Sequence, residues 1–342
     1  MTDSTRPAPH LNPDLPAALL AVCPAYVPSP LTRAEIGGVA VWVKDETHRM
    51  GLGAFKALGG VYAVARLIER QVGHDVAPAD FTDDAVRKIA RNMTFVCASA
   101  GNHGMAVAAG AAIFGATARI HLADTVPEAF VARLQAKGAE VVRSGATYEE
   151  SIVAAIADAE STGAIHLADG SWPGYTEPPR LVMEGYTAIA EEMRQSFEAS
   201  GDWPDHVYLQ AGVGGLAGAV AAMIRANWAV QPRITVVEPD AAPCLRDSAA
   251  AGRIVTVPGP VSNMGRLDCK TPSMLAFDIL RDAAVQYVTI TDDQARAAVA
   301  TAKQAGFSTT PSGVAGLAAL LANDAPDANP LVILSEGGLD DE

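Results

Sequence analysis

The sequence of 342 residues predicts an α/β fold of two doubly wound domains with mostly parallel sheets. Short apolar runs recur along the chain, and such runs are typical of strands buried on both faces of a parallel sheet. Segments of helical period lie between most of these runs, which is the order expected of an α/β protein. The length corresponds to about two domains when a domain is taken as about 150 residues.

A proline-rich arm precedes the first predicted strand. Residues 1–30 contain seven prolines, which fix φ and remove backbone donors, so no long helix is expected there. The segment 128–138 has helical period and is predicted to end on Gly138 as a C-cap. The predicted strands lie at residues 39–43, 94–99, 118–123, 140–144, 164–169, 206–210, 233–238 and 330–335.

Charge and composition argue against several classes of function. The chain has 39 acidic residues against 25 lysines and arginines, a net charge of −14, which repels nucleic acid and anionic membrane surfaces. The four cysteines show no spacing typical of a zinc site or a disulfide framework. The start of the chain lacks the order of a signal peptide, and no stretch has about 18 apolar residues. We therefore expect a cytoplasmic protein without a metal site, a nucleic-acid partner or a membrane partner.

Ligands of doubly wound sheets bind in the loops that join a strand to the next helix. In QAGVGGLAGAVAAM, Gly212, Gly214 and Gly215 let the backbone approach a ligand closely, and the start of the next helix offers free N–H groups to a phosphate. The run from Gly212 to Ala217 also matches the G-x-G-x-x-A dinucleotide fingerprint, with Glu238 where an acid would bind ribose. A dinucleotide, another phosphate and a structural turn all stay open for this loop.

A second loop of this kind reads SAGNHG. Ser99, Ala100 and Gly101 are small, so their N–H groups are open to a carboxylate, and the Asn102 amide can reach a hydroxyl or phenolate of a ligand. His103 could act as a base. At a helix start, however, a capping or packing role is more common for histidine, because a base must also have reach.

The third feature is Lys56 in KDETHRMGLGAFKALGG, inside a predicted helix. A helical lysine usually extends to solvent. Its neighbours here are small and apolar, and desolvation would lower the pKa of the amine and favour the nucleophilic form that makes a Schiff base. Lys56, the phosphate loop and the Asn102 amide together suit pyridoxal phosphate, whereas NAD has no need of the lysine.

The ordered segments resemble the tryptophan-synthase-β-like, fold type II group of pyridoxal-phosphate enzymes, and within it most closely diaminopropionate ammonia-lyase and its relatives. The resemblance rests on KDETHRMGLGAFKALGG, SAGNHG, DGSWPGYTEPP, LQAGVGGLAGAV, VVEPD, PSGVAGL and LSEGGLD and covers roughly residues 30–342. It implies that Lys56 binds the cofactor covalently, that Asn102 holds the phenolic oxygen and that Ser335 faces the pyridine nitrogen. It also implies that the phosphate is wrapped by Gly212, Val213, Gly214, Gly215 and Leu216.

The resemblance implies a pyridoxal-phosphate-dependent lyase. A hydroxyl such as that of Ser335 cannot keep a pyridine nitrogen protonated, so prompt loss of a β-substituent suits this site better than transamination. The freed Lys56 amine would remove the Cα proton, and the aminoacrylate that leaves would hydrolyse to a 2-keto acid and ammonia. In SAGNHG, residues 99–104 and hereafter the asparagine loop, the predicted substrate contacts are Ser99, Ala100, Gly101 and His103, with the backbone and Ser99 holding the α-carboxylate.

Departures from the family pattern bear on specificity. Ala100 stands where lyases that use both enantiomers carry an aspartate, so we expect L-configured or otherwise single-face substrates. Asp169 matches the second family carboxylate and would protonate the leaving group, or else it is a turn residue. Arg266 and Asp268, in NMGRLDCKTP, replace small residues and would read the distal charge of the substrate. The other interpretation is a solvated charged loop.

Three classes of function stay open. We favour β-elimination on a β-substituted amino acid, by an ammonia-lyase or dehydratase. A β-replacement synthase would use the same residues, and the third class comprises a racemase, an amino-acid sensor and a nicotinamide enzyme. The predicted layout is an arm at 1–30, a large cofactor-binding domain at 31–87 and 191–342, and a small mobile domain at 88–190 that closes over the site. Relatives are commonly dimers, which predicts a homodimer.

Overall fold

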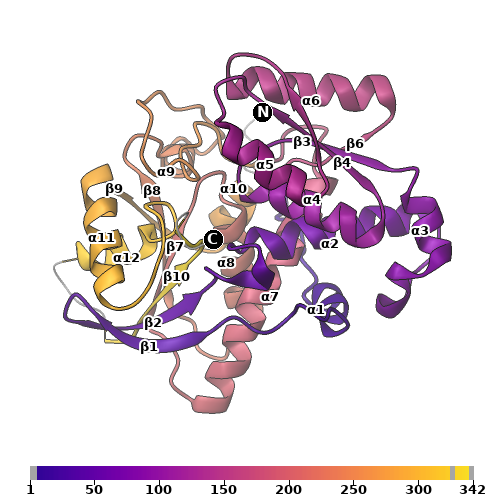
Figure 1. Cartoon of the computed structure of the whole chain (residues 1–342). Helices are drawn as coiled ribbons and strands as arrows, with labels where there is room; N and C mark the ends of the chain where they lie inside the picture. Colours follow the sequence, from indigo (N-terminus) through magenta and orange to yellow (C-terminus); the bar gives the residue numbers. More distant parts are fainter. Residues whose placement is uncertain (1–5, 324–327, 339–342) are drawn as a thin grey trace.

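The computed structural model describes residues 6–323 and 328–338, which form two sheets flanked by helices (Figure 1). The larger sheet has the strand order β1-β2-β10-β7-β8-β9 and the smaller one the order β5-β4-β3-β6. Among these described strands, β1 and β2 are antiparallel, and the other neighbours pair in parallel. The predicted α/β fold with mostly parallel sheets is therefore confirmed.

Buried apolar strands form the middle of the larger sheet. Every residue of β7 and β10 is buried, as expected for strands covered by helices on both faces. The larger sheet contains β1 Leu31–Ile36, β2 Val39–Asp45, β7 His206–Gln210, β8 Arg233–Pro239, β9 Gln286–Ile290 and β10 Pro330–Leu334. The smaller sheet contains β3 Thr94–Ala98, β4 Thr117–Leu122, β5 Glu140–Arg143 and β6 Ile165–His166.

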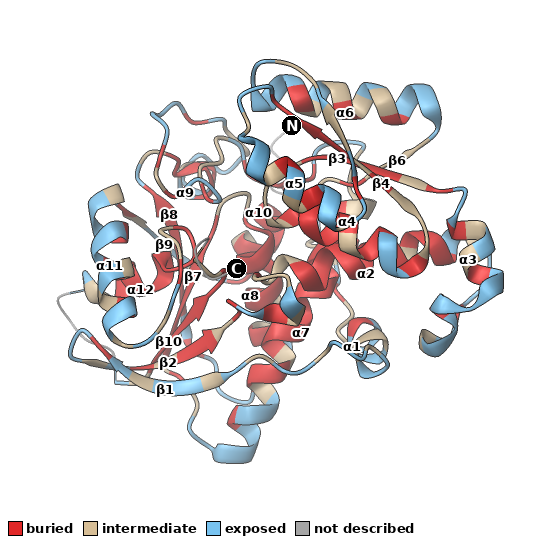
Figure 2. Ribbon diagram, in the orientation of Figure 1, coloured by how far each residue is buried: buried red, intermediate tan, exposed pale blue. Residues whose placement is uncertain are grey.

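Helices cover both sheets, and α2 and α7 are the most deeply buried of the long ones, whereas α6 and α11 keep an exposed face (Figure 2). The α-helices are α1 Asp14–Ala21, α2 Lys56–Val72, α3 Asp84–Ala90, α4 Asn102–Phe114, α5 Glu128–Ala136, α6 Tyr148–Thr162, α7 Glu177–Ser200, α8 Gly215–Asn227, α9 Cys244–Ala251, α10 Met274–Asp282, α11 Asp292–Gln304 and α12 Ala315–Leu321. Short 3₁₀ helices lie at η2 Arg49–Gly51 and η3 Pro78–Thr82. No helix in the described ranges is both long and apolar enough to cross a membrane.

Several boundaries differ from the sequence-based prediction. The strands β1 and β9 were not predicted, because they lie at sheet edges and mix exposed with buried positions instead of forming continuous apolar runs. The strand predicted at 164–169 is shorter, since β6 has two residues. The C-cap of α5 is Lys137, and Gly138 follows it at a φ of +83°. Residues 6–30, the described part of the arm, contain one short α-helix, α1.

The two sheets are formed by separate parts of the chain (Figure 1). The smaller sheet lies within residues 94–166, inside the interval predicted as the small domain, and α7 crosses the predicted boundary at residue 190. The division into domains and the mobility of the small one stay predictions. Residues 1–5 of the predicted arm, and 324–327 and 339–342 of the predicted large domain, lie outside the described residues.

A buried network of charged side chains fastens the arm to the larger sheet. The Arg49 guanidinium donates from Nε to Glu46 at 2.7 Å and from Nη1 to Glu192 at 2.8 Å. Lys44 also pairs with Glu192, and the hydroxyl of Tyr26, in the arm, donates to the same carboxylate at 2.8 Å. The arm, β2 and α7 therefore meet at one group of compensating charges.

Replacing Arg49 with methionine is expected to lower the free energy of unfolding by about 3 kcal/mol, because Glu46 would lose its buried cation and Glu192 one of two. Urea unfolding at pH 7 measures the loss. The exposed pair of Arg296 and Asp293 provides a control, since Arg296→Met should change stability by less than about 0.5 kcal/mol. Equal effects of the two substitutions would contradict a stabilising role for the network.

The same network should make the free energy of unfolding depend on pH in the acidic range. Burial alone would raise the pKa of Glu192, but hydrogen bonds and charge from Arg49 and Lys44 hold that pKa below its ordinary value. A carboxyl of this kind stabilises the fold above its unfolded pKa of about 4.3. That contribution is lost as the pH falls through the lower pKa of the folded state.

Candidate active site

Lys56 is the first residue of α2, and the loop before it is bonded to the end of β10. The Phe55 N–H donates to the Ser335 carbonyl at 3.1 Å, and the Gly337 N–H donates to the Gly53 carbonyl at 3.0 Å. Gly53 has a φ of +75°, a conformation that favours glycine. The last described strand therefore fixes the position from which the lysine side chain extends.

The Lys56 amine forms an ion pair with the Asp169 carboxylate, and the two side chains are 22% and 26% exposed. Burial would lower the pKa of Lys56, but the charge and hydrogen bond of Asp169 outweigh it and raise this pKa above its ordinary value. The predicted lowering is therefore wrong in this structure, because it considered desolvation without the carboxylate. Burial would raise the pKa of Asp169, and Lys56 holds it well below its usual range instead.

The glycine-rich loop predicted to bind phosphate, residues 211–214, lies between β7 and α8. Gly214 has a φ of +98° and serves as the N-cap of α8, so no side chain caps the first N–H groups of the helix. A Cβ at Gly212 would lie 2.9 Å from the Arg266 carbonyl, and one at Gly214 would lie 3.0 Å from Ala276 Cβ. The loop therefore needs glycine at both positions and leaves backbone donors open to an anion. Val213 and Leu216 belong to the same turn.

The Glu238 carboxylate is not free to bind a ribose. Its carboxylate accepts hydrogen bonds from the N–H groups of Leu245 at 2.7 Å and Arg246 at 2.8 Å, and so caps the start of α9. Burial raises the pKa of Glu238 to about 7. The dinucleotide interpretation of the glycine pattern is therefore corrected, since its acid is already used within the fold.

The asparagine loop joins β3 to α4. Asn102 begins α4 and donates from Nδ2 to the Glu336 carboxylate. Ser99 accepts the Gly101 N–H on its hydroxyl oxygen at 3.3 Å, and Ala100 packs against the core. His103 is 5% exposed, and its Nε2 lies 2.8 Å from the Leu167 carbonyl. Burial lowers the pKa of His103, and this contact points its ring into the fold.

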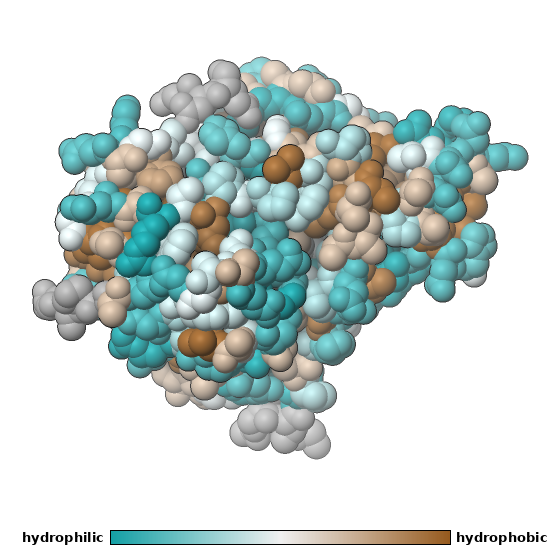
Figure 3. Space-filling view, turned by 90° about the horizontal axis from the view of Figure 1, so that it is seen from below, coloured by the Kyte–Doolittle hydropathy of each residue, from teal (hydrophilic) through white to brown (hydrophobic). Residues whose placement is uncertain are grey.

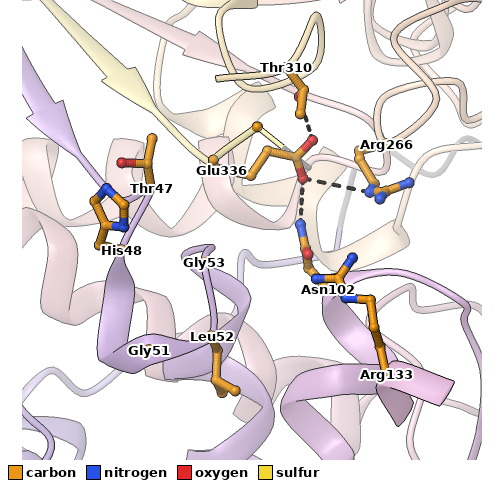
Figure 4. A pocket seen from close by; sticks show the side chains of 12 residues that line it. Thr47, His48, Gly51, Leu52, Gly53, Asn102, Arg133, Arg266, Thr310 and Glu336 are labelled. Carbon is orange, nitrogen blue, oxygen red and sulfur yellow. Dashed lines mark hydrogen bonds and ion pairs between the residues drawn. The ribbon is translucent and has the colours of Figure 1, made fainter. Parts of the chain in front are cut away.

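Glu336 was missed in the sequence and lines a cavity of about 230 Å³ together with Asn102 and Arg266 (Figure 4). Its carboxylate accepts a hydrogen bond from the Thr310 hydroxyl at 2.5 Å and lies 3.6 Å from Arg266 Nε. The sequence could have indicated Glu336, because it is an acidic residue just after the carboxyl end of a predicted buried strand. The lining residues are Thr47, His48, Gly51, Leu52, Gly53, Asn102, Arg133, Arg266, Thr310, Glu336, Gly337 and Gly338. Lys56 and Asp169 are not among them.

The structure separates the two charged residues predicted to contact substrate. Arg266 lines the cavity, and its Nε lies 3.3 Å from the Cβ position at Gly101. Asp268 instead pairs with Lys270 at 2.5 Å and accepts the Ser262 N–H at 3.2 Å. Arg266 is therefore brought to the asparagine loop, whereas Asp268 holds the loop that carries it.

Ser335 and Tyr186 both contact Phe55, the residue before Lys56. Ser335 is 4% exposed, and its backbone N–H donates to the Gly313 carbonyl at 3.2 Å. Tyr186 was missed because it lies in the middle of α7, far from any loop, yet its ring packs against Phe55 with 4.8 Å between ring centroids. In the part of the chain that the structure describes, no group of three or more His, Cys, Asp or Glu is arranged to hold a metal.

Similarity to proteins of known activity extends over most of the chain. Residues 22–336 match the family model described as pyridoxal-phosphate dependent enzyme. Diaminopropionate ammonia-lyase of Escherichia coli is 35% identical over 277 residues, which are 79% of this chain and 69% of that protein. L-threonine ammonia-lyase of Geobacter sulfurreducens is 31% identical over 250 residues, which are 72% of this chain and 59% of that protein.

A solved structure resembles this one over nearly its full length. The crystal structure of diaminopropionate ammonia lyase from Escherichia coli in complex with an aminoacrylate-PLP azomethine reaction intermediate superposes with a TM-score of 0.85 and 30% sequence identity. The match covers 96% of this chain and 89% of that chain. The similarity therefore extends over nearly the whole fold.

Proposed function

Because this chain belongs to the pyridoxal-phosphate dependent enzyme family, we propose that it eliminates the β-amino group of 2,3-diaminopropionate to give a 2-keto acid and ammonia. Its fold is fold type II, its cofactor is pyridoxal phosphate, and its reaction class is β-elimination by an ammonia-lyase. One observation supports this choice of substrate. The Asp169 carboxylate already binds an ammonium group in this structure, namely that of Lys56.

The residues of the site fit pyridoxal phosphate. The uncapped N–H groups of α8 suit its phosphate, and the Lys56 amine suits its aldehyde carbon. Asn102 would face the phenolic oxygen and Ser335 the pyridine nitrogen. When bound, the cofactor supplies an electron sink that stabilises negative charge at Cα.

Proton transfer in this site would involve Lys56 and Asp169. The Lys56 amine would take the Cα proton once it is neutral. The β-ammonium of the substrate would replace the Lys56 ammonium as the partner of Asp169, and its positive charge would keep the carboxylate ionised as that of Lys56 does. Because a β-ammonium leaves as neutral ammonia without a further proton, an ionised Asp169 suits this leaving group better than the hydroxyl of serine.

Other parts of the site support a single-face reaction. Ala100 offers no second base beside Lys56 and Asp169, which favours the L-enantiomer. The backbone of the asparagine loop and Arg266 would hold the α-carboxylate, since Arg266 lies against Gly101.

The protein would act in the cytoplasm as a homodimer with a small domain that closes over the cleft. On the face shown in Figure 3, apolar side chains form separate patches among hydrophilic ones.

A product assay tests the function. Diaminopropionate and water contain the atoms of one pyruvate and two ammonia molecules, whereas serine gives one ammonia per pyruvate. We expect the purified protein to release two ammonia molecules per 2-keto acid from the L-enantiomer. Values of kcat/KM should be about 10²-fold lower for L-serine and for the D-enantiomer, each of which lacks one favourable contact or base.

The same assay separates the alternatives. Loss of keto acid in favour of a new amino acid when a thiol is added would indicate β-replacement. Comparable turnover of both enantiomers would contradict the role given to Ala100, and an ammonia ratio of one with serine as the best substrate would contradict the role of Asp169.

A further inference from the structure

The phenol of Tyr186 is a buried donor without an acceptor. The side chain is 1% exposed, and its O–H has no acceptor among the described residues, although the Lys56 amine lies close to the phenol oxygen. A buried hydroxyl left unpaired is costly, so a group of this kind in a native site calls for an explanation. Burial raises the pKa of Tyr186, whereas the charge of Lys56 and a hydrogen bond from its amine oppose that rise.

Glycines on three helices leave the space that the Tyr186 ring occupies. A Cβ at Gly59, on α2, would lie 2.4 Å from Tyr186 Cε1, and one at Gly185 would lie 2.6 Å from the Leu58 carbonyl. These two glycines let α7 approach α2 closely enough to bring the ring beneath the start of the lysine helix. On the other side, Cε2 lies 3.6 Å from the Cβ position at Gly215, the first residue of α8.

The ring therefore extends from the helix of Lys56 to the start of the phosphate loop helix. We propose that Tyr186 is a further ligand of the cofactor phosphate, and that its O–H donates to a phosphate oxygen beside the N–H groups of α8. The anion would provide the missing acceptor, and a hydrogen bond to a charged group is stronger than one between neutral groups. This inference rests on the proposed function only for the presence of the cofactor.

Tyr186→Phe tests the proposal, because it should weaken the binding of pyridoxal phosphate without destabilising the protein. In protein stripped of cofactor, removing an unpaired hydroxyl should leave the midpoint of thermal unfolding unchanged or raised. The Kd for pyridoxal phosphate, measured by quenching of protein fluorescence, should rise by about 10-fold or more. The Kd for pyridoxal, which lacks the phosphate, should not change.

Tyr287→Phe is a matched control, because the Tyr287 hydroxyl is also buried without a partner but lies on β9 at the edge of the larger sheet. It should affect unfolding as Tyr186→Phe does and leave both dissociation constants unchanged. Equal weakening of both ligands by Tyr186→Phe, or weakening of neither, overturns the proposal. These measurements do not use turnover, so a protein that binds pyridoxal phosphate without eliminating ammonia would overturn the proposed function alone.

Discussion

Replacing Lys56 with alanine is expected to lower kcat/KM for β-elimination by about 10⁴-fold, the upper end for loss of an acid–base residue. The substitution removes the amine proposed both to bind the cofactor and to take the Cα proton. Steady-state release of 2-keto acid measures the loss. Borohydride reduction followed by peptide mapping should label residue 56 in the unsubstituted protein and no residue in the variant.

Lys303→Ala is the matched control, because Lys303 is exposed in the last turn of α11. Its kcat/KM and its labelling at residue 56 should equal those of the unsubstituted protein. Labelling of a different residue, or substantial turnover by the Lys56 variant, would contradict the roles given to Lys56. The description of the fold would not be affected.

Replacing Asp169 with asparagine should act in opposite directions on turnover and on cofactor attachment. Turnover of diaminopropionate is expected to fall by about 10³-fold, since the β-ammonium would lose its carboxylate partner. Covalent attachment of pyridoxal phosphate should become faster at neutral pH. An amine must be neutral to attack an aldehyde, and Asp169 raises the pKa of Lys56, so removing the carboxylate lets the amine lose its proton at lower pH.

The attachment rate, followed by absorbance between pH 6 and 10, checks the sign, because the profile of the variant should shift toward lower pH. Asp293→Asn provides a control, since Asp293 is exposed at the start of α11. If Asp169 were only a turn residue beside Gly170, the substitution would leave both turnover and the attachment profile unchanged.

The interior of the fold could be predicted because buried parallel strands are apolar along their whole length. The runs at 206–210 and 330–335 are strands in the structure, and their burial on both faces is what makes them recognisable. The edge strands β1 and β9 mix exposed and buried positions, so their short sequences carry a weaker signal. Boundaries such as that of β6 depend on pairing partners that local sequence does not specify.

The candidate site was predictable where it lies in loops between strands and helices, as at Asn102 and Gly214. Partnerships between distant residues were not. Lys56 and Asp169 are 113 positions apart, and Asn102 and Glu336 are 234 positions apart, so no local pattern indicates that either pair meets. The lysine pKa was predicted in the wrong direction for this reason. Likewise, only the folded loop distinguishes Arg266, beside the cavity, from Asp268, which faces Lys270.

The position of β10 in the larger sheet has a consequence for biosynthesis. This strand, residues 330–334, lies between β2 and β7, and its end is bonded to the segment that leads into Lys56. A nascent chain on the ribosome thus carries two strands whose shared neighbour has not yet been translated. Pairing across such long sequence separations is slow, so the lysine would reach its final position only after the ribosome has passed residue 334, while the smaller sheet can assemble earlier.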